Sequence, residues 1–154
     1  MSQKIAVVRI RGAVKVRKDI EDTLSMLNLS KPHQVVILDD RPVYLGMLDK
    51  AKDYITYGEI EPEVLESLLL KWGRIEGDKR LTEAYVKEKT GQTVKQFIKT
   101  VMNFEKDLND LEIKKVFRLH PPKKGYKDIK RAFTQGGDVG YRGTEINALL
   151  RRMI

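Results

Sequence analysis

Lysine and arginine are the residue types whose number and spacing in this sequence could carry a binding chemistry. Residues 113–154 hold 11 of them against three acids, a net charge of +8 that equals the formal charge of the whole chain. Residues 1–18 hold six basic residues and no acid, whereas residues 19–112 have a net charge of −6. Because these cations pair with phosphate, a fold that brings both basic segments to one side would attract a polyphosphate.

The candidate phosphate contacts form two groups, one in each basic segment. The second group surrounds two prolines at 121–122, which fix an extended path that cannot join a helix, and an irregular loop can follow the shape of RNA. Tyr126 could stack on an unpaired base or pack on the protein, and Arg142 could contact phosphate or pair with Asp138. For the basic residues the alternative is a solvated run of charge. The candidate RNA contacts are Arg9, Arg11, Lys15, Arg17, Lys18, Arg118, Lys123, Lys124, Tyr126, Lys127, Lys130, Arg131, Arg142, Arg151 and Arg152.

The other residue types exclude several classes of site. No cysteine is present, so disulfides, thiolate nucleophiles and sulfur-bound metals are excluded. His33 and His120 are the only histidines and have no nearby second ligand, so we expect no metal site. Asp39 and Asp40 lie where carboxylates commonly precede a helix, and no base or nucleophile accompanies them. The loop Gly136–Gly143 lacks the Gly-Lys-Ser/Thr of a phosphate-binding loop. We expect no catalytic residue and no cofactor.

Length and hydropathy indicate an ordinary intracellular domain. With 154 residues and 41% apolar content, the chain can build one core with a small annex. The apolar run Ile5–Val8 is too short for a signal peptide, and no stretch approaches the roughly 20 apolar residues of a membrane span. We therefore expect a cytoplasmic protein without a membrane partner.

The first 60 residues alternate strands and helices. Apolar alternation and β-branched runs predict strands over 4–11, 34–38 and 54–60. Helices are expected over 17–27, which Asn28 would end in a left-handed conformation, and over 42–52, where Pro42 takes the first position. The order β-α-β-α-β predicts an α+β fold of the ferredoxin-like kind, with a three-stranded sheet and two helices on one face.

Residues 61–154 predict a mostly helical annex. Helices are expected from Pro62 to about residue 72, from a Thr82 cap to residue 89, over 94–101, and after a Thr144 cap. Residues 74–80 should form a charged loop, and 115–119 and 130–133 a small strand pair. We therefore divide the chain into a core, 1–60, and a helical extension, 61–154, which ends in the basic segment 113–154.

Specific motifs in both parts resemble one known family. The helix end Leu24–Leu29, the Asp40-Arg41-Pro42 turn and the Gly46-Met47 pair closely resemble large-subunit ribosomal protein number thirty. The run Phe117–Tyr126 and the Gly136-Gly137-Asp138-x-Gly140-x-Arg142 loop resemble the extension of its archaeal and eukaryotic members, the latter being large-subunit protein number seven. Only three residues precede the first strand here, which is typical of the archaeal type.

This resemblance implies a structural constituent of the large ribosomal subunit. Its expected partners are ribosomal RNA and neighbouring ribosomal proteins, with no small-molecule substrate and no catalysis. Two alternatives stay open: a stand-alone RNA-modifying or nucleotide-dependent enzyme that uses the Gly136–Gly143 loop, and a free RNA chaperone.

Overall fold

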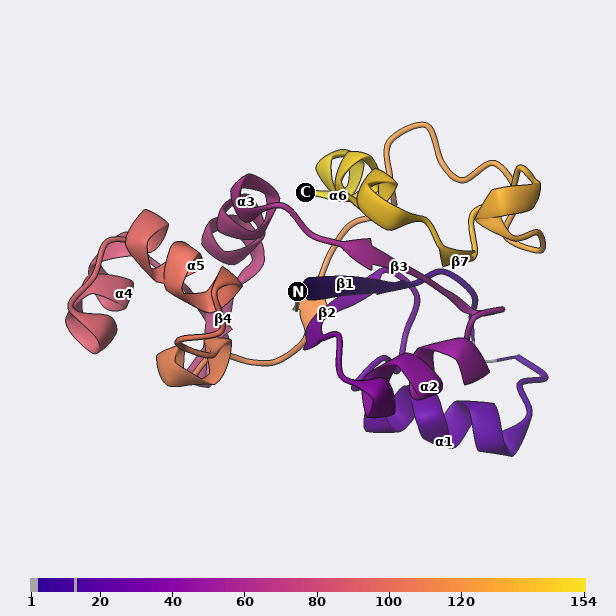
Figure 1. Cartoon of the computed structure of the whole chain (residues 1–154), viewed down its shortest axis with the longest axis horizontal. Coiled ribbons are helices and arrows are strands. Elements are labelled where there is room, and N and C mark those ends of the chain that lie inside the picture. The colour runs from indigo at the N-terminus through magenta and orange to yellow at the C-terminus, as the bar shows by residue number, and fades with distance from the viewer. Residues whose placement is uncertain (1–2, 13) are drawn as a thin grey trace.

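The computed structural model describes residues 3–12 and 14–154 of the chain. Its first 60 residues alternate strands and helices as the sequence predicts (Figure 1), in the order β1 Lys4–Arg9, α1 Lys18–Met26, β2 Gln34–Asp39, α2 Pro42–Lys50 and β3 Ile55–Glu59. The rest of the chain forms α3 Pro62–Trp72, β4 Arg74–Ile75, β5 Lys79–Arg80, α4 Glu83–Thr90, α5 Val94–Met102, β6 Phe117–Arg118, β7 Gly140–Tyr141 and α6 Ile146–Met153.

A five-stranded sheet in the order β6-β2-β1-β3-β7 forms the centre of the molecule. Strand β1 is antiparallel to both β2 and β3, which confirms the ferredoxin-like α+β core. The two outer strands come from residues 61–154: β6 pairs antiparallel with the start of β2, and β7 pairs parallel with β3. The sheet therefore extends across both parts into which the sequence was divided.

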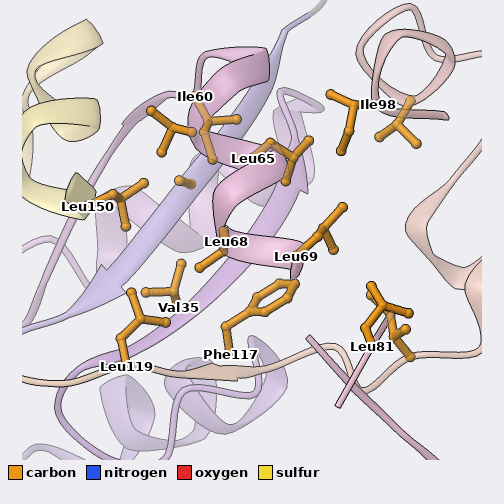
Figure 2. Close-up of a cluster of buried hydrophobic side chains, with 14 of the residues drawn as sticks. Val35, Ile60, Leu65, Leu68, Leu69, Leu81, Ile98, Phe117, Leu119 and Leu150 are labelled. Atoms are coloured by element: carbon orange, nitrogen blue, oxygen red, sulfur yellow. The ribbon is translucent and has the colours of Figure 1, made fainter. Parts of the chain in front are cut away.

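Both faces of the sheet are covered, and every residue of β1 is buried. Ile5 and Val7 belong to a cluster with the apolar residues of α1 and α2, as the expected arrangement of two helices on one face requires. Ala6 and Val8 belong to a second cluster on the opposite face. That cluster contains Phe117 and apolar residues of α3, α5 and α6 (Figure 2). Each fully buried Val or Leu contributes about 1.5–3 kcal/mol relative to an exposed one, so both clusters stabilise the sheet.

Helix α1 ends as its sequence predicts. Asn28 is left-handed, with φ of 62°, and the Leu29 amide donates to the Leu24 carbonyl at 2.9 Å. Leu24 and Leu29 are fully buried, so the apolar contact that accompanies this type of cap is present. The cap fixes the direction in which the chain leaves α1 and returns to the sheet as β2.

Helix α4 of the annex also begins and ends at the expected signals. The Thr82 hydroxyl accepts from the Tyr85 amide at the start of α4, and left-handed Gly91 ends that helix. Leu65, Leu68 and Leu69 of α3 are buried between the sheet and α5 (Figure 2). None of the helices in the described residues is long and apolar enough to cross a membrane.

Three expectations about the annex are wrong. Residues 74–80 form the hairpin β4–β5 around left-handed Gly77 and Asp78, and its two-residue strands are too short for a visible alternation. Residues 130–133 form a single bridge, Ala132 with Val139, in place of a strand. Thr144 makes no side-chain cap, because a 3-10 turn, Gly143–Glu145, precedes α6.

Candidate nucleic-acid interface

The topology brings the two basic segments to one end of the sheet. Arg9 ends β1 beside the start of β3, and Gln34 at the start of β2 pairs with Arg118 at the end of β6. The chain after β1 (residues 10–12 and 14–18), the turn before β2 and the chain from Arg118 to residue 131 therefore meet the sheet at the same end. In Figure 1 the indigo chain between β1 and α1 lies at the lower right, whereas the orange chain after β6 starts near the centre and rises past α6 to the top and upper right. We call the region where these segments meet the sheet the basic end of the sheet.

His33 links the two segments there. Its amide donates to the Arg9 carbonyl at 2.7 Å, and its Nδ1 lies 3.1 Å from the Tyr126 hydroxyl. The two rings are nearly parallel, with centroids 6.0 Å apart. Burial raises the pKa of Tyr126 to about 12. Of the two alternatives for Tyr126, the structure shows the one in which it packs on the protein.

Most of the candidate cations at the basic end are exposed. Arg17 pairs with Asp19 at 2.9 Å and Arg131 with Asp128 at 3.5 Å. Eight further exposed cations make no ion pair within the described part of the chain: Lys15, Lys18, Lys31, Arg118, Lys123, Lys124, Lys127 and Lys130.

Lys31 is the one member of this set that sequence reasoning missed. It lies in the acidic middle of the sequence, so the charge pattern gave no signal for it. Its place in the turn before β2 brings it to the basic end, and pairing of β2 with both β1 and β6 fixes that place. Its own amide donates to the Gln34 side chain at 3.1 Å, which holds the turn.

Arg9 does not lie on the exposed surface. Because α1 covers the face of β1 that Arg9 shares with Ile5 and Val7, its side chain is only 2% exposed. Its Nη1 donates to the Leu29 carbonyl at 2.6 Å and its Nε to the Arg11 carbonyl at 2.9 Å. Burial lowers its pKa. The residue fastens the end of β1 to the segment after α1, and this burial argues against a phosphate contact.

Arg11 is also partly withdrawn from the surface. Its guanidinium carbon lies 4.9 Å from the centroid of the Tyr54 ring, and the side chain is half-buried. This cation–π contact holds the first residues of the loop against the start of β3.

Arg142 forms a buried network with Asp138 and β3. Its Nη2 lies 3.3 Å from Asp138 Oδ1 and donates to the Asp138 carbonyl at 2.5 Å, while its Nε donates to Thr56 Oγ1 at 2.7 Å. Both members of the ion pair are buried. Burial lowers the pKa of Arg142, and the hydrogen bond to Asp138 opposes that shift. The structure thus shows the Asp138 pairing that the sequence left open, and it attaches the glycine loop to the sheet.

The glycine loop packs on its own chain. A Cβ on Gly137 would lie 2.0 Å from the Arg131 carbonyl oxygen, so only glycine fits there. The amide of Gly137 donates to the Ala132 carbonyl at 2.8 Å, and that of Asp138 to the Asp128 carbonyl at 3.0 Å. Amides already bonded to carbonyls cannot hold a phosphate, which weighs against nucleotide binding by this loop.

The two C-terminal arginines hold parts of the fold together. Arg152 Nη1 donates to the carbonyls of Lys123 and Gly125 at 3.2 and 3.1 Å, and the Lys123 amide donates back to the Arg152 carbonyl at 3.0 Å. Arg151 pairs with Glu61 at 3.2 Å. The last turn of α6 therefore fixes the turn that presents the lysines at 123 and 124.

Within residues 3–12 and 14–154, no group of three or more His, Cys, Asp or Glu could hold a metal ion. The basic end is thus a surface of exposed cations carried by loops at one end of the sheet.

Comparisons with known proteins find one family along nearly the whole chain. A family model described as ribosomal protein L30p/L7e matches residues 5–55. The large ribosomal subunit protein uL30 of Methanopyrus kandleri is 50% identical over 149 residues, 94% of this chain and 100% of its own length. Proteins of the same name from Archaeoglobus fulgidus and Methanosphaera stadtmanae are 50% and 46% identical over 150 residues each, covering 96% and 97% of this chain and 98% and 99% of their own lengths.

Proposed function

This chain belongs to the ribosomal protein L30p/L7e family, and from that membership we infer that it is a structural constituent of the large ribosomal subunit. The family is structural and non-enzymatic, so the chain is not an enzyme. Nothing supports the alternative of an RNA-modifying or nucleotide-dependent enzyme that uses the Gly136–Gly143 loop. As a ribosomal constituent the protein acts in translation and associates with ribosomal RNA and other ribosomal proteins.

We propose that the basic end of the sheet is the surface that binds the RNA. The observation that carries this proposal is that eight exposed cations without an ion pair among the described residues lie in four segments that meet the sheet where β1 ends and β2 begins. Their affinity for phosphate would be largely independent of sequence, and the fold would supply the register. In this proposal residues 1–60 supply the three central strands of the sheet, and residues 61–154 supply its two outer strands and most of the cations. The expected compartment is the cytoplasm.

Several predicted contact residues take another role in this proposal. Arg9, Arg142 and Arg152 hold the loops from inside, since their guanidinium groups donate to backbone carbonyls. A rigid loop loses less conformational freedom when it binds, so these residues would raise affinity without touching RNA. Neighbouring ribosomal proteins are expected partners of the remaining surface.

The proposal is tested by charge reversal at the turn that α6 holds. Lys123, Lys124 and Lys127 are replaced together by glutamate, and incorporation into large subunits is measured by co-sedimentation after a salt wash. All three side chains are exposed, so the circular dichroism spectrum should not change while incorporation is lost.

A matched control reverses three exposed lysines on α4 and α5, Lys87, Lys95 and Lys99. This triple variant carries the same change in net charge and should incorporate much better than the first. Equal loss in both variants would show that total charge alone governs incorporation, and full incorporation of the first variant would exclude the basic end as the RNA surface.

A further inference from the structure

A small cleft lies between the β4–β5 hairpin and the segment that leads into β6. It has a volume of about 190 Å³ and is lined by Trp72, Arg74, Asp78, Lys114, Val116 and Arg118. The Lys114 amide donates to the Arg74 carbonyl at 2.8 Å, which holds the two walls together. We call it the Trp72 cleft. Only Arg118 among its residues belongs to the basic end described above.

Three cations of the Trp72 cleft face one carboxylate. Lys114 Nζ lies 3.1 Å from Asp78 Oδ1. The hydrogen bond and charge of Lys114 lower the pKa of Asp78, and the charges of Arg118 and Arg74 lower it further. The carboxylate therefore senses all three cations, yet it can neutralise only one of them. Arg74 Nη1 donates to the carbonyls of Lys71 and Gly73 at 3.4 and 3.1 Å, but these neutral acceptors do not compensate its charge. Two positive charges therefore remain at the mouth of the cleft, so it attracts anions.

Trp72 adds an aromatic wall to this cationic site. The Arg74 guanidinium carbon lies 6.0 Å from the centroid of the indole, and the His120 ring packs edge-on against it at 4.6 Å. The indole Nε1 is buried and has no hydrogen-bond partner among the described residues. A buried donor without a partner is costly, so binding that moved the indole and brought an acceptor to this N–H would relieve the cost.

We propose that the Trp72 cleft binds a single unpaired nucleotide of the ribosomal RNA, with Arg74 and Arg118 on its phosphate and Trp72 beside its base. The inference rests on the proposed function and extends it to the annex. Cations combined with an aromatic face are the pattern by which proteins hold single-stranded nucleic acid. The volume is below the roughly 300–1,000 Å³ of pockets that enclose whole small molecules, which suits one nucleotide of a longer strand.

The position of the cleft favours RNA over an acidic protein segment. Arg118 pairs with β2 at the basic end, and the chain continues from it through His120 to Lys123 and Lys124. An RNA strand bound across those lysines could therefore continue to the cleft along a surface that stays positively charged. An acidic peptide would satisfy the arginines but would leave the indole without a stacking partner.

Trp72 itself provides the test, because it is the only tryptophan in the chain. Purified full-length protein is titrated with large-subunit ribosomal RNA, and tryptophan emission is recorded beside a filter-binding isotherm, with free tryptophan amide as the correction for absorption. Stacking or hydrogen bonding at the indole should change the emission along the same isotherm. Saturable binding with constant emission would refute the cleft while leaving the proposed function intact, whereas the absence of any binding would refute both.

Two arginines of the same hairpin supply the matched variants. Arg74→Gln should reduce the emission change. It should also make the negative slope of log K against log salt shallower by about 0.7–0.9, the value of one phosphate contact. Arg80→Gln removes an exposed charge that does not line the cleft and should leave the emission change intact. Equal behaviour of the two variants would overturn the proposal, as would polyglutamate that changes the emission when RNA does not.

Discussion

Replacing Lys123, Lys124 and Lys127 by glutamine should remove three phosphate contacts and leave the fold unchanged. Each phosphate neutralised contributes about 0.7–0.9 to the slope of log K against log salt. If all eight unpaired cations of the basic end contact phosphate, the slope of the wild-type protein is about −6 to −7. Raising salt from about 50 to 200 mM should then weaken its binding by roughly 4,000- to 16,000-fold.

The triple variant keeps five of those contacts. Its slope should be about −3.5 to −4.5, so the same rise in salt should weaken binding by only about 100 to 500-fold. Filter binding of the protein to large-subunit ribosomal RNA at four or more salt concentrations measures both slopes. Unfolding by urea serves as the check on stability, which should be unchanged because the three side chains are exposed.

The corresponding glutamine variant of Lys87, Lys95 and Lys99 should keep the wild-type slope. Those lysines are equally exposed but lie on α4 and α5, away from the basic end. If the two triple variants have the same slope, the cations act through net charge alone and the reasoning about a defined surface fails. A wild-type slope near zero would refute the electrostatic mechanism altogether.

Three further variants probe what holds the basic end in place. Arg142→Ala should lower the free energy of unfolding by about 3–5 kcal/mol, because it leaves the Asp138 carboxylate buried without its partner; a loss below about 1 kcal/mol in urea would contradict this. Gly137→Ala should lower the free energy of unfolding by about 1–3 kcal/mol or more, because the new Cβ would overlap a backbone carbonyl. Gly46→Ala, in open space on α2, should raise that free energy by up to about 1 kcal/mol. The hydrogen bond that Tyr141 donates to Glu59 raises the pKa of Tyr141 to about 12. The stability that this hydrogen bond contributes should therefore be present below about pH 10 and be lost as the pH rises toward 12. Tyr141→Phe should flatten that alkaline loss in denaturation curves, and an unchanged pH profile would show that the hydrogen bond does not matter.

The local elements of this fold could be predicted because their signals lie within a few residues of each other. The left-handed Asn28 after α1 and the Thr82 cap of α4 are examples, since each depends only on neighbouring amides. The hairpin β4–β5 could not be predicted in the same way. Its two-residue strands carry no periodicity, and their pairing is fixed by the packing of Leu81 and the α3 helix around them.

The exposure of the candidate site residues could likewise be predicted only where it depends on neighbours in the sequence. The composition of the lysine-rich loop indicated its exposure, and its cations are exposed in the structure. Arg9 looked the same in sequence but is buried, because the helix that covers it comes from a later segment. Lys31 was missed for the converse reason, since it has no basic neighbours in sequence and reaches the basic end only through the pairing of β2.

The sequence by itself determined the order of the elements in residues 1–60, the apolar stripes of the main helices, the segregation of charge and the family. Only the tertiary structure decided which cations are free, that β6 and β7 complete the sheet, and that a tryptophan lies beside Arg74 and Arg118 in one cleft. The reason is physical: periodicity and capping act over a few residues, whereas exposure and pairing depend on contacts such as that of Arg142 with Thr56, 86 positions apart.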